Sequence, residues 1–516
     1  MTAIADLMTG RAQAISRRLP NRVDLLALYA QLSDHGRRPD TMLLETRTGS
    51  SILLDQAAVR IECRGGKVTL DALSTNGRAV LDLIERRLAD HVTSRSPDAL
   101  SLFFERSNEV DAERRLLAGS PFDALRAITG GLRNDTPEEA MAVCLIGTIA
   151  FDHVDLFEDL PASAEDPMGF PDFIFWLAES AIIAEPGLTP RLVCTAFNAG
   201  ETDENDRRGH FSAVERLGEL ARRASDVHAL APLAGAPSPI SVDLDDEAFA
   251  LTVTSLKEHI LAGDVYQVVP SRTFSAPCPD PLSAFARVRS IDRSPYMFFM
   301  AMAEQCLFGA SPETSVRISR EAGALTLEVK PMAGTRSRGA DGDQDDRMEA
   351  ELRLDHKESA EHMMLVDLAR NDVARVCEPG TRHVAQLMGL EKYARVMHLV
   401  SSVKGRLADR YDALHALQAC LNVGTLSGAP KIKATQLLRR YERTRRGPYG
   451  GAIGWLSGEG LMDTGVVIRS ALVKEGVAHV RAGAGVVHDS DPMAEADETR
   501  RKASAILAAI AGERGR

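Results

Sequence analysis

Two pairs of glutamates are the residues of this chain best suited to metal chemistry. Glu358 and Glu361 lie in one segment, and Glu495 and Glu498 lie near the C-terminus. Residues three apart share a helix face, so each pair would present two carboxylates together. Facing one another, the pairs would suit Mg²⁺, which takes one or two carboxylates plus waters, and the absence of His and Cys from them disfavours zinc. Either pair alone is better explained as surface charge, the second with a Glu498–Lys502 ion pair.

Two glycine-containing segments could hold an anionic ligand. In 481–485 glycines alternate with alanine, and exposed N–H groups there would bind carboxylate or phosphate, although a tight strand bend explains the pattern equally well. In the loop 422–430, Thr425 and Ser427 offer hydroxyls where a helix begins. Ordinary helix capping is the preferred explanation of that loop taken alone.

Three shorter segments add single groups. Glu313 follows a turn, and the segment 330–336 ends a strand in a glycine turn. Arg469 stands among strand-like apolar residues, so it needs an anionic partner. A substrate carboxylate or a structural ion pair would satisfy it equally well.

The elements that must position these residues are helices and strands without strict βαβ alternation. Helices are expected over 77–88, 203–225 and 356–372, after Pro430, and after a cap at Asp491 with Pro492 in the first turn. The apolar run 363–366 indicates burial, whereas the basic run 439–446 is interpreted as a solvated helix end. Strands are expected over 51–54, 68–70, 452–456, 465–468 and 477–481. The pattern predicts an α/β or α+β fold with a large sheet system.

Composition narrows the class of protein further. The net charge of −12 is unfavourable for nucleic-acid binding, and no apolar run is long enough to span a membrane. Seven widely spaced cysteines without a Cys-x-x-Cys pair predict reduced thiols in a cytoplasmic compartment. Residues 1–18 lack a compact apolar block, so no signal peptide is expected and the protein is expected to be soluble. A Pro- and Ala-rich linker at 230–240 would divide an N-terminal region, 1–229, from a region that holds nearly all the motifs, 241–516.

The motifs, taken in order, resemble the chorismate-utilising enzymes, and within them the anthranilate synthase component I family. The resemblance rests on the helix from His356, the loop 422–431, Pro448–Gly451, Arg481–Gly485 and the segment 495–500. It implies a large two-sheet chorismate-binding fold with helices packed outside. It also implies the amination of chorismate to anthranilate with release of pyruvate.

The same resemblance assigns roles to residues. Metal ligands would be Glu361 and Glu498, with Glu358 and Glu495 supporting them around Mg²⁺. The catalytic residues would be Glu313 as general acid, Thr425, and His398 in the second step, where a buried structural histidine is an equally good explanation. The substrate would be held by Gly334, Thr335, Tyr449, Arg469, Gly483, Ala484, Gly485 and Lys502. The inhibitor tryptophan, if it binds, would lie near Thr46, Pro295, Tyr296 and Met297.

Several positions separate the relatives. Ala333 and Gln267 stand where other members of the family carry lysines that attack the ring or deprotonate water. Both differences favour an ammonia-using enzyme. No glutamine amidotransferase motif is found, so a partner subunit or free ammonium must supply ammonia. Asp292 and Arg293 replace an uncharged pair of the family, which predicts weakened feedback by tryptophan. The alternatives are a 2-amino-2-deoxyisochorismate synthase that stops before pyruvate leaves, and a silent regulatory subunit.

Overall fold

The structure, a computed structural model, describes residues 9–162, 165–199, 203–231, 235, 239–393 and 396–512. The proposed linker at 230–240 and the first residues of the chain fall largely outside these ranges.

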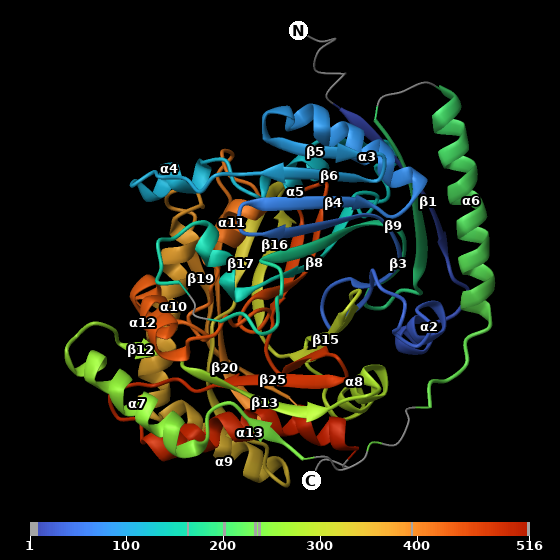
Figure 1. The fold of residues 1–516 in the computed structure, drawn as a ribbon. Coiled ribbons are helices and arrows are strands. Elements are labelled where there is room, and N and C mark those ends of the chain that lie inside the picture. Colours follow the sequence, from blue (N-terminus) through green and yellow to red (C-terminus); the bar gives the residue numbers. More distant parts are fainter. Residues whose placement is uncertain are drawn as a thin grey trace.

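The helices lie mostly on the outside of the molecule (Figure 1). They are α2 (Leu25–Leu32), α3 (Thr75–Arg87), α4 (Ala112–Leu117), α5 (Asp123–Thr129), α6 (Asp203–Ser225), α7 (Asp246–Leu261), α8 (Pro281–Ile291), α9 (Gly342–Leu354), α10 (His356–Ala374), α11 (Ala413–Cys420), α12 (Lys431–Glu442) and α13 (Pro492–Ala511), with 3₁₀ turns η1 (Ala89–His91) and η2 (Phe151–Leu156). No helix of the described residues is long and apolar enough to cross a membrane.

The strands form one large hydrogen-bonded network and one short pair, β12 with β21. They are β1 (Gly10–Arg18), β2 (Thr41–Thr46), β3 (Ser51–Arg64), β4 (Lys67–Ala72), β5 (Val92–Ser96), β6 (Ala99–Phe103), β7 (Leu132–Asn134), β8 (Cys144–Ile149), β9 (Phe173–Ala184), β10 (Arg191–Asn198), β11 (Ser241–Val242), β12 (Gln267–Val268), β13 (Ser271–Pro277), β14 (Tyr296–Ala301), β15 (Gln305–Ser311), β16 (Thr314–Glu321), β17 (Ala324–Val329), β18 (Met332–Ser337), β19 (His383–Lys392), β20 (Val396–Arg406), β21 (Gly428–Ala429), β22 (Ala452–Ser457), β23 (Met462–Val466), β24 (Ser470–Lys474) and β25 (Val477–Gly483).

Two long strands, β3 and β9, pair with each other and join two arms of this network. One arm runs from β9 through β8, β22, β23, β16 and β17 to β20, which also pairs with β18 and β19. The other runs from β3 through β2, β14, β15, β24 and β25 to β13. The expected mixed fold with an extensive antiparallel sheet system is confirmed, and its two sheets are continuous through β3 and β9.

The two halves of the sequence share both arms. Strand β8 of the first half pairs with β22 of the second, and β2 pairs with β14. The sheets of residues before and after the proposed linker are therefore hydrogen-bonded to each other.

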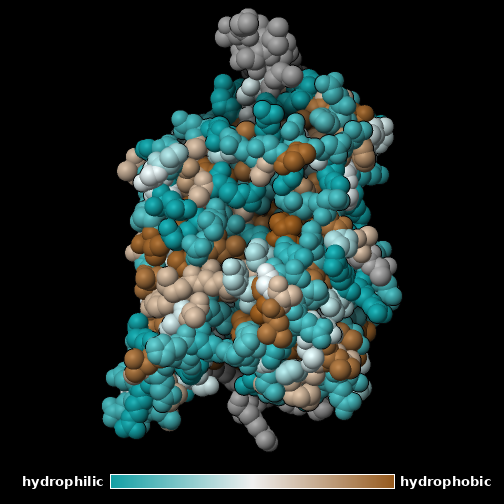
Figure 2. Space-filling model, turned by 90° about the vertical axis from the view of Figure 1, so that its left-hand side faces the viewer, coloured by the Kyte–Doolittle hydropathy of each residue, from teal (hydrophilic) through white to brown (hydrophobic). Residues whose placement is uncertain are grey.

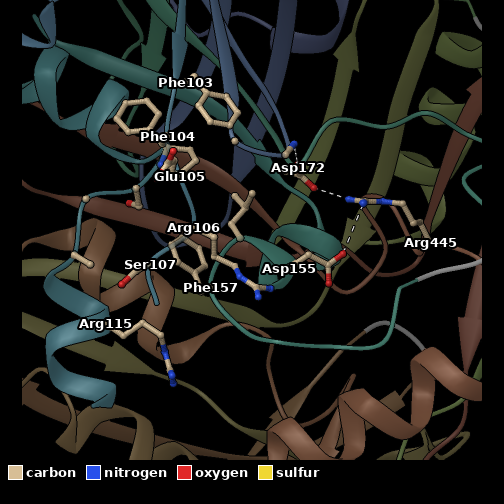
Figure 3. A pocket seen from close by; sticks show the side chains of 17 residues that line it. Phe103, Phe104, Glu105, Arg106, Ser107, Arg115, Asp155, Phe157, Asp172 and Arg445 are labelled. Atoms are coloured by element: carbon tan, nitrogen blue, oxygen red, sulfur yellow. Dashed lines mark hydrogen bonds and ion pairs between the residues drawn. The ribbon is translucent and has the colours of Figure 1, made fainter. Parts of the chain in front are cut away.

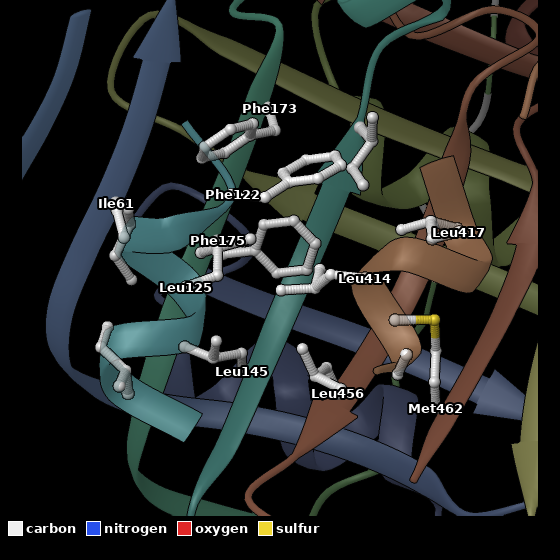
Figure 4. Packing of buried hydrophobic residues seen from close by; sticks show 14 of the residues in the cluster. Ile61, Phe122, Leu125, Leu145, Phe173, Phe175, Leu414, Leu417, Leu456 and Met462 are labelled. Carbon is white, nitrogen blue, oxygen red and sulfur yellow. The ribbon is translucent and has the colours of Figure 1, made fainter. Parts of the chain in front are cut away.

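Buried apolar side chains from distant segments fill the space between sheet and helices. Figure 4 shows Phe122 and Leu125 near α5 packing towards Phe173 and Phe175 of β9, with Leu414 of α11 on the other side. Each such aromatic or leucine side chain contributes about 1.5–3 kcal/mol when fully buried. By contrast, the face in Figure 2 is mostly hydrophilic, with hydrophobic side chains in separate small groups. All seven cysteines are free thiols, as expected.

Local sequence signals explain where the two glutamate-bearing helices begin. The Asp491 side chain caps α13 by accepting from the Ala494 amide, and Pro492 occupies its first turn. The Asp355 side chain caps α10 by accepting from the amides of Lys357 and Glu358. These caps fix the first turns, and therefore the directions of the glutamates one turn further on.

Candidate active site

A buried carboxyl group stands at the centre of the candidate site. Glu313, between β15 and β16, is 4% exposed, and its Oε1 accepts a hydrogen bond of 2.8 Å from the Thr425 hydroxyl. None of the described residues forms an ion pair with it. Burial raises the pKa of Glu313 to about 8, against smaller opposite effects of Thr425 and Lys502. Glu313 is therefore mostly protonated at neutral pH and able to donate a proton.

His398 of β20 supplies a second group that exchanges protons. It is 6% exposed, and burial lowers the pKa of its imidazole to about 4, with the charge of Arg469 acting in the same direction. Its Nδ1 lies 2.9 Å from Thr335 Oγ1 and 3.3 Å from the Gly334 carbonyl oxygen. The ring is therefore neutral and oriented through Nδ1, and no described residue hydrogen-bonds its Nε2.

Gly334 makes this contact possible. It lies in β18 at φ +81°, where the register with β20 shifts between Ala333 and Thr335. A Cβ atom there would be strained and would lie 3.4 Å from Glu358 Oε2. The sequence predicted that a strand ends here in a glycine turn. In the structure, Gly334 instead lies at a bulge within strand β18.

The first glutamate pair lies at the start of α10. The Oε1 of Glu361 accepts a hydrogen bond of 2.8 Å from the Gln267 side chain, whereas Glu358 forms an ion pair with Arg336 at 3.2 Å. Burial raises the pKa of Glu361, and the charge of Glu358 adds to that effect. A Cβ atom at Gly485 would come within 2.7 Å of the Gln267 Nε2, so a larger residue there would displace the side chain that binds Glu361.

The second pair lies on α13. Glu498 forms the expected ion pair with Lys502 at 2.6 Å, and Lys502 also donates to the Gly483 carbonyl oxygen at 3.0 Å. Burial opposes ionisation of Glu498, but Lys502 holds its pKa below the ordinary value. Glu495 is 7% exposed, burial raises its pKa, and its Oε2 is buried without a hydrogen-bond partner among the described residues.

The charge of Lys502 influences residues of both glutamate pairs and both proton-exchanging groups, Glu313 and His398. Within the pairs, this charge acts on Glu361 and Glu498. The structure therefore brings the metal, catalytic and lysine candidates around one region. Among the described residues no group of three or more His, Cys, Asp or Glu side chains is close enough together to hold a metal ion.

Arg469 is a partly buried cation that forms no ion pair with any described residue. It does not lie within a strand, as the sequence suggested, but between β23 and β24 at φ +48°. Burial lowers its pKa, and the charges of Asp292, Tyr449 and Glu498 partly offset this. No described side chain accepts a hydrogen bond from its guanidinium, so an anionic ligand could.

Tyr449 and the end of β25 form a wall near these groups. Tyr449 is 7% exposed, and burial raises the pKa of its phenol to about 12. Gly483 packs against it, since a Cβ atom there would lie 3.0 Å from the Tyr449 hydroxyl oxygen. Ala484 is fully buried directly before Gly485. A hollow of about 20 Å³ beside Glu313 and Thr425 belongs to the same region.

The four residues proposed for inhibitor binding form a separate cluster on paired strands. Tyr296 and Thr46 are register partners in β14 and β2. The Tyr296 hydroxyl donates to Asp463 at 2.6 Å, and Thr46 Oγ1 is buried without a hydrogen-bond partner among the described residues. Met297 is buried beside them, and the Pro295 carbonyl accepts from the Arg47 amide at 3.0 Å.

Two sequence interpretations are wrong here. The run 439–446 is not simply a solvated helix end, because Arg439 and Arg446 are 7% and 5% exposed and pair with buried acids. Met363, in the run expected to be buried all round α10, is 45% exposed. The charges of the run 439–446 predicted a solvent-exposed helix end. That prediction failed because the acids that pair with Arg439, Asp152 and Asp155, are remote in the sequence.

A larger cavity, of about 210 Å³, lies away from the site, between β6, η2 and the segment before α5 (Figure 3). Figure 3 shows Arg445 directed at Asp172 and Asp155 on one side of this cavity and Phe157 on another. None of the predicted site residues lines it.

Comparison with known proteins agrees with this arrangement. The family model described as chorismate binding enzyme matches residues 88–508. The chain is 45% identical to anthranilate synthase component 1 of Vibrio cholerae, over 97% of each chain, and 46% identical to the pyocyanine-specific component 1 of Pseudomonas aeruginosa, over 90% of this chain and 88% of the other.

A solved structure of anthranilate synthase component I from Streptococcus pneumoniae is 28% identical and superposes with a TM-score of 0.67, covering 90% of this chain and 93% of that one. The chain therefore belongs to the chorismate-binding enzymes, and within them to the component 1 proteins of anthranilate synthase.

Proposed function

We propose that this chain is the chorismate-aminating subunit of an anthranilate synthase, converting chorismate and ammonia to anthranilate and pyruvate. The observation that carries the proposal is Glu313, a buried carboxyl group that remains protonated at neutral pH beside the Thr425 hydroxyl. The names of the full-length relatives support the same reaction.

Amination needs a general acid because hydroxide is a poor leaving group from the chorismate ring. Glu313 would donate a proton to the departing hydroxyl while ammonia adds to the ring, and Thr425 would hold the carboxyl in place. The product of this step is 2-amino-2-deoxyisochorismate.

Elimination needs a base for the ring proton. His398 would accept that proton at Nε2, which no described residue hydrogen-bonds, while its Nδ1 donates to the Gly334 carbonyl oxygen. The bond from the ring to the enolpyruvyl oxygen then breaks, the enolpyruvyl carbon gains a proton, and pyruvate leaves the aromatic anthranilate.

The remaining residues would hold the substrate. Arg469, a partly buried guanidinium without a described counter-ion, suits the enolpyruvyl carboxylate together with Tyr449. Backbone groups at Gly334–Thr335 and at Gly483–Gly485, with Lys502 beside them, would contact the carboxylates of the substrate.

The carboxylates present fit Mg²⁺. Glu361 and Glu498 would hold it, with Glu358 and Glu495 in support, because Mg²⁺ needs only one or two carboxylates plus water and an anionic ligand. Two observations support this proposal: Glu495 Oε2 is buried without a hydrogen-bond partner among the described residues, and burial together with the charge of Glu358 raises the pKa of Glu361. When bound, Mg²⁺ would neutralise the ring carboxylate of chorismate.

Ammonia would come from a glutamine-hydrolysing component 2 subunit in the cytoplasm. The isolated chain should therefore use ammonium, but not glutamine, at a mildly alkaline pH near 8, where some free NH₃ is present and part of Glu313 is still protonated. Glutamine-dependent activity of the chain alone would contradict this assignment.

The test is a stoichiometric assay. Purified chain with chorismate, Mg²⁺ and ammonium is expected to release anthranilate, followed by fluorescence, and pyruvate in equal amounts. Accumulation of a non-aromatic amino product without pyruvate would instead identify a 2-amino-2-deoxyisochorismate synthase.

The role of His398 can be tested in the same assay. His398→Met should retain amination and accumulate the non-aromatic amino intermediate, because no other described imidazole contacts Thr335 and Gly334. Equal release of anthranilate and pyruvate at the wild-type rate would remove His398 from the mechanism.

A further inference from the structure

A buried ion pair at the C-terminal end of α12 lies between several segments of the candidate site. Glu442 and Arg446 are four residues apart, with side chains only 4% and 2% exposed, and their charged atoms approach to 2.6 Å. The mechanism above uses neither residue. Two charges this deeply buried are costly unless hydrogen bonds satisfy their remaining atoms.

Glu442 is saturated with donors. Its Oε1 accepts from the amide and the hydroxyl of Ser271 and from Arg446, and its Oε2 accepts from Arg446 and Arg481, all between 2.6 and 3.1 Å. Burial alone would raise its pKa, but the charges of Arg446 and Arg481 hold it below the ordinary value. The carboxylate is therefore a fixed anchor for Arg446.

Arg446 uses its remaining donors on backbone carbonyls. Its Nη1 donates to the Leu426 oxygen and its Nη2 donates to the Val269 oxygen, each at 2.7 Å. Leu426 follows Thr425, the partner of Glu313. Val269 lies two residues after Gln267, the partner of Glu361.

The guanidinium also lies over the faces of two aromatic rings. Its central carbon lies 4.4 Å from the centroid of Phe151 and 5.8 Å from that of Tyr449. Tyr449 is the proposed substrate contact whose hydroxyl packs against Gly483. One side chain therefore touches the loop 422–430, the segment 267–270 and Tyr449.

We infer that Arg446, anchored by Glu442, is a positioning residue that fixes these three segments relative to one another and thereby shapes the chorismate site. The inference rests on the proposed function. Only a planar guanidinium can bind a carboxylate through two atoms, donate to two carbonyls in different directions and stack on a ring. Lysine would keep the charge and lose that geometry.

The experiment compares Arg446→Lys with a matched control, Arg191→Lys. Arg191 likewise binds a buried acid, Glu139, through two hydrogen bonds of 2.8 and 3.0 Å, but it lies on β10 and contacts none of the three segments. Both variants lose a two-point arginine–glutamate contact, so both should lose stability. Steady-state kinetics with chorismate and ammonium, and hydrogen exchange of peptides covering 266–271 and 421–430, are measured for each.

For Arg446→Lys we expect the KM for chorismate to rise about tenfold or more, because small displacements of binding groups are expensive. Exchange in the two peptides should also accelerate. Arg191→Lys should change neither. If the two variants lose stability to the same extent and keep the wild-type KM and exchange rates, Arg446 is merely structural and the inference fails. Failure of the wild-type chain to aminate chorismate would instead refute the proposed function, and the exchange comparison would still decide the inference.

Discussion

Ionisable groups with restricted access to solvent have close counter-ions in the N-terminal region, whereas two such groups at the candidate site have none among the described residues. In the N-terminal region, Glu139 is held by two hydrogen bonds from Arg191, and Asp55 by Arg38 and Arg216. At the candidate site, Glu313 is similarly buried and Arg469 is partly buried, yet neither forms an ion pair with any described residue. Among these groups, the paired charges of the N-terminal region hold the fold together, whereas the two unpaired ionisable groups of the candidate site are available to a ligand or a proton.

The largest expected effect is on catalysis at Glu313. Glu313→Gln keeps the shape and the acceptor for Thr425 but removes the acidic proton, so kcat should fall by about 10²–10⁴-fold. Folding should be unimpaired, because a buried carboxyl without a counter-ion is replaced by a neutral amide. Steady-state assays and thermal melts check both expectations. Normal turnover of Glu313→Gln would show that this unpaired buried carboxyl group does not serve catalysis.

The next effect concerns the carboxylates proposed for Mg²⁺. Glu361→Gln and Glu498→Gln should each abolish most turnover and weaken Mg²⁺ binding measured by calorimetry, because the site has few charged ligands. Asp367→Asn is the control, since this carboxylate lies on the same helix α10 with its side chain 65% exposed. Normal activity in either glutamate variant, or in excess chelator, would reject the metal assignment.

The complementary experiment breaks a paired charge. Glu139→Gln removes the buried partner of Arg191, which keeps its ion pair with Glu185 at 2.7 Å, so the free energy of unfolding should fall by about 1–3 kcal/mol. Both kcat and the KM for chorismate should stay unchanged well below the melting temperature. Denaturant titration measures the loss of stability, and steady-state kinetics measures kcat and KM. A large loss of kcat without loss of stability would contradict the structural role assigned to the Glu139–Arg191 pair.

The smallest effect is expected in feedback control. Asp292 accepts hydrogen bonds from the amide and hydroxyl of Ser294, beside the segment proposed to bind tryptophan. Asp292→Asn with Arg293→Pro removes both charges and should strengthen inhibition by about two- to fivefold, the range typical of exposed charges. Tight inhibition of the unmodified chain would show that the two charges do not matter.

Local signals in the sequence predicted α3, α6, α10, α12 and α13, whereas the other helices of the described residues were not predicted. The bounds of α6 and the cap of α13 were expected because periodicity, a capping aspartate and a following proline lie next to one another in the chain. The site motifs were found because their order resembles a family. Burial was harder to predict: the environment of Arg446 depends on Val269 and Ser271, which the fold brings from far away in the sequence. Arg469 was expected in a strand because its neighbours are apolar, but it lies in the left-handed region between two strands.

The protonation state of Glu313 tests the central claim most directly. Its pKa is raised to about 8, so between about pH 4.5 and 8 the folded protein keeps a proton that the unfolded chain loses, and this group therefore lowers stability as pH rises through that range. Infrared difference spectra between wild type and Glu313→Gln should show a protonated carboxyl band at pH 6 that disappears as the pH is raised through about 8. A carboxylate already ionised at pH 6 would contradict the account.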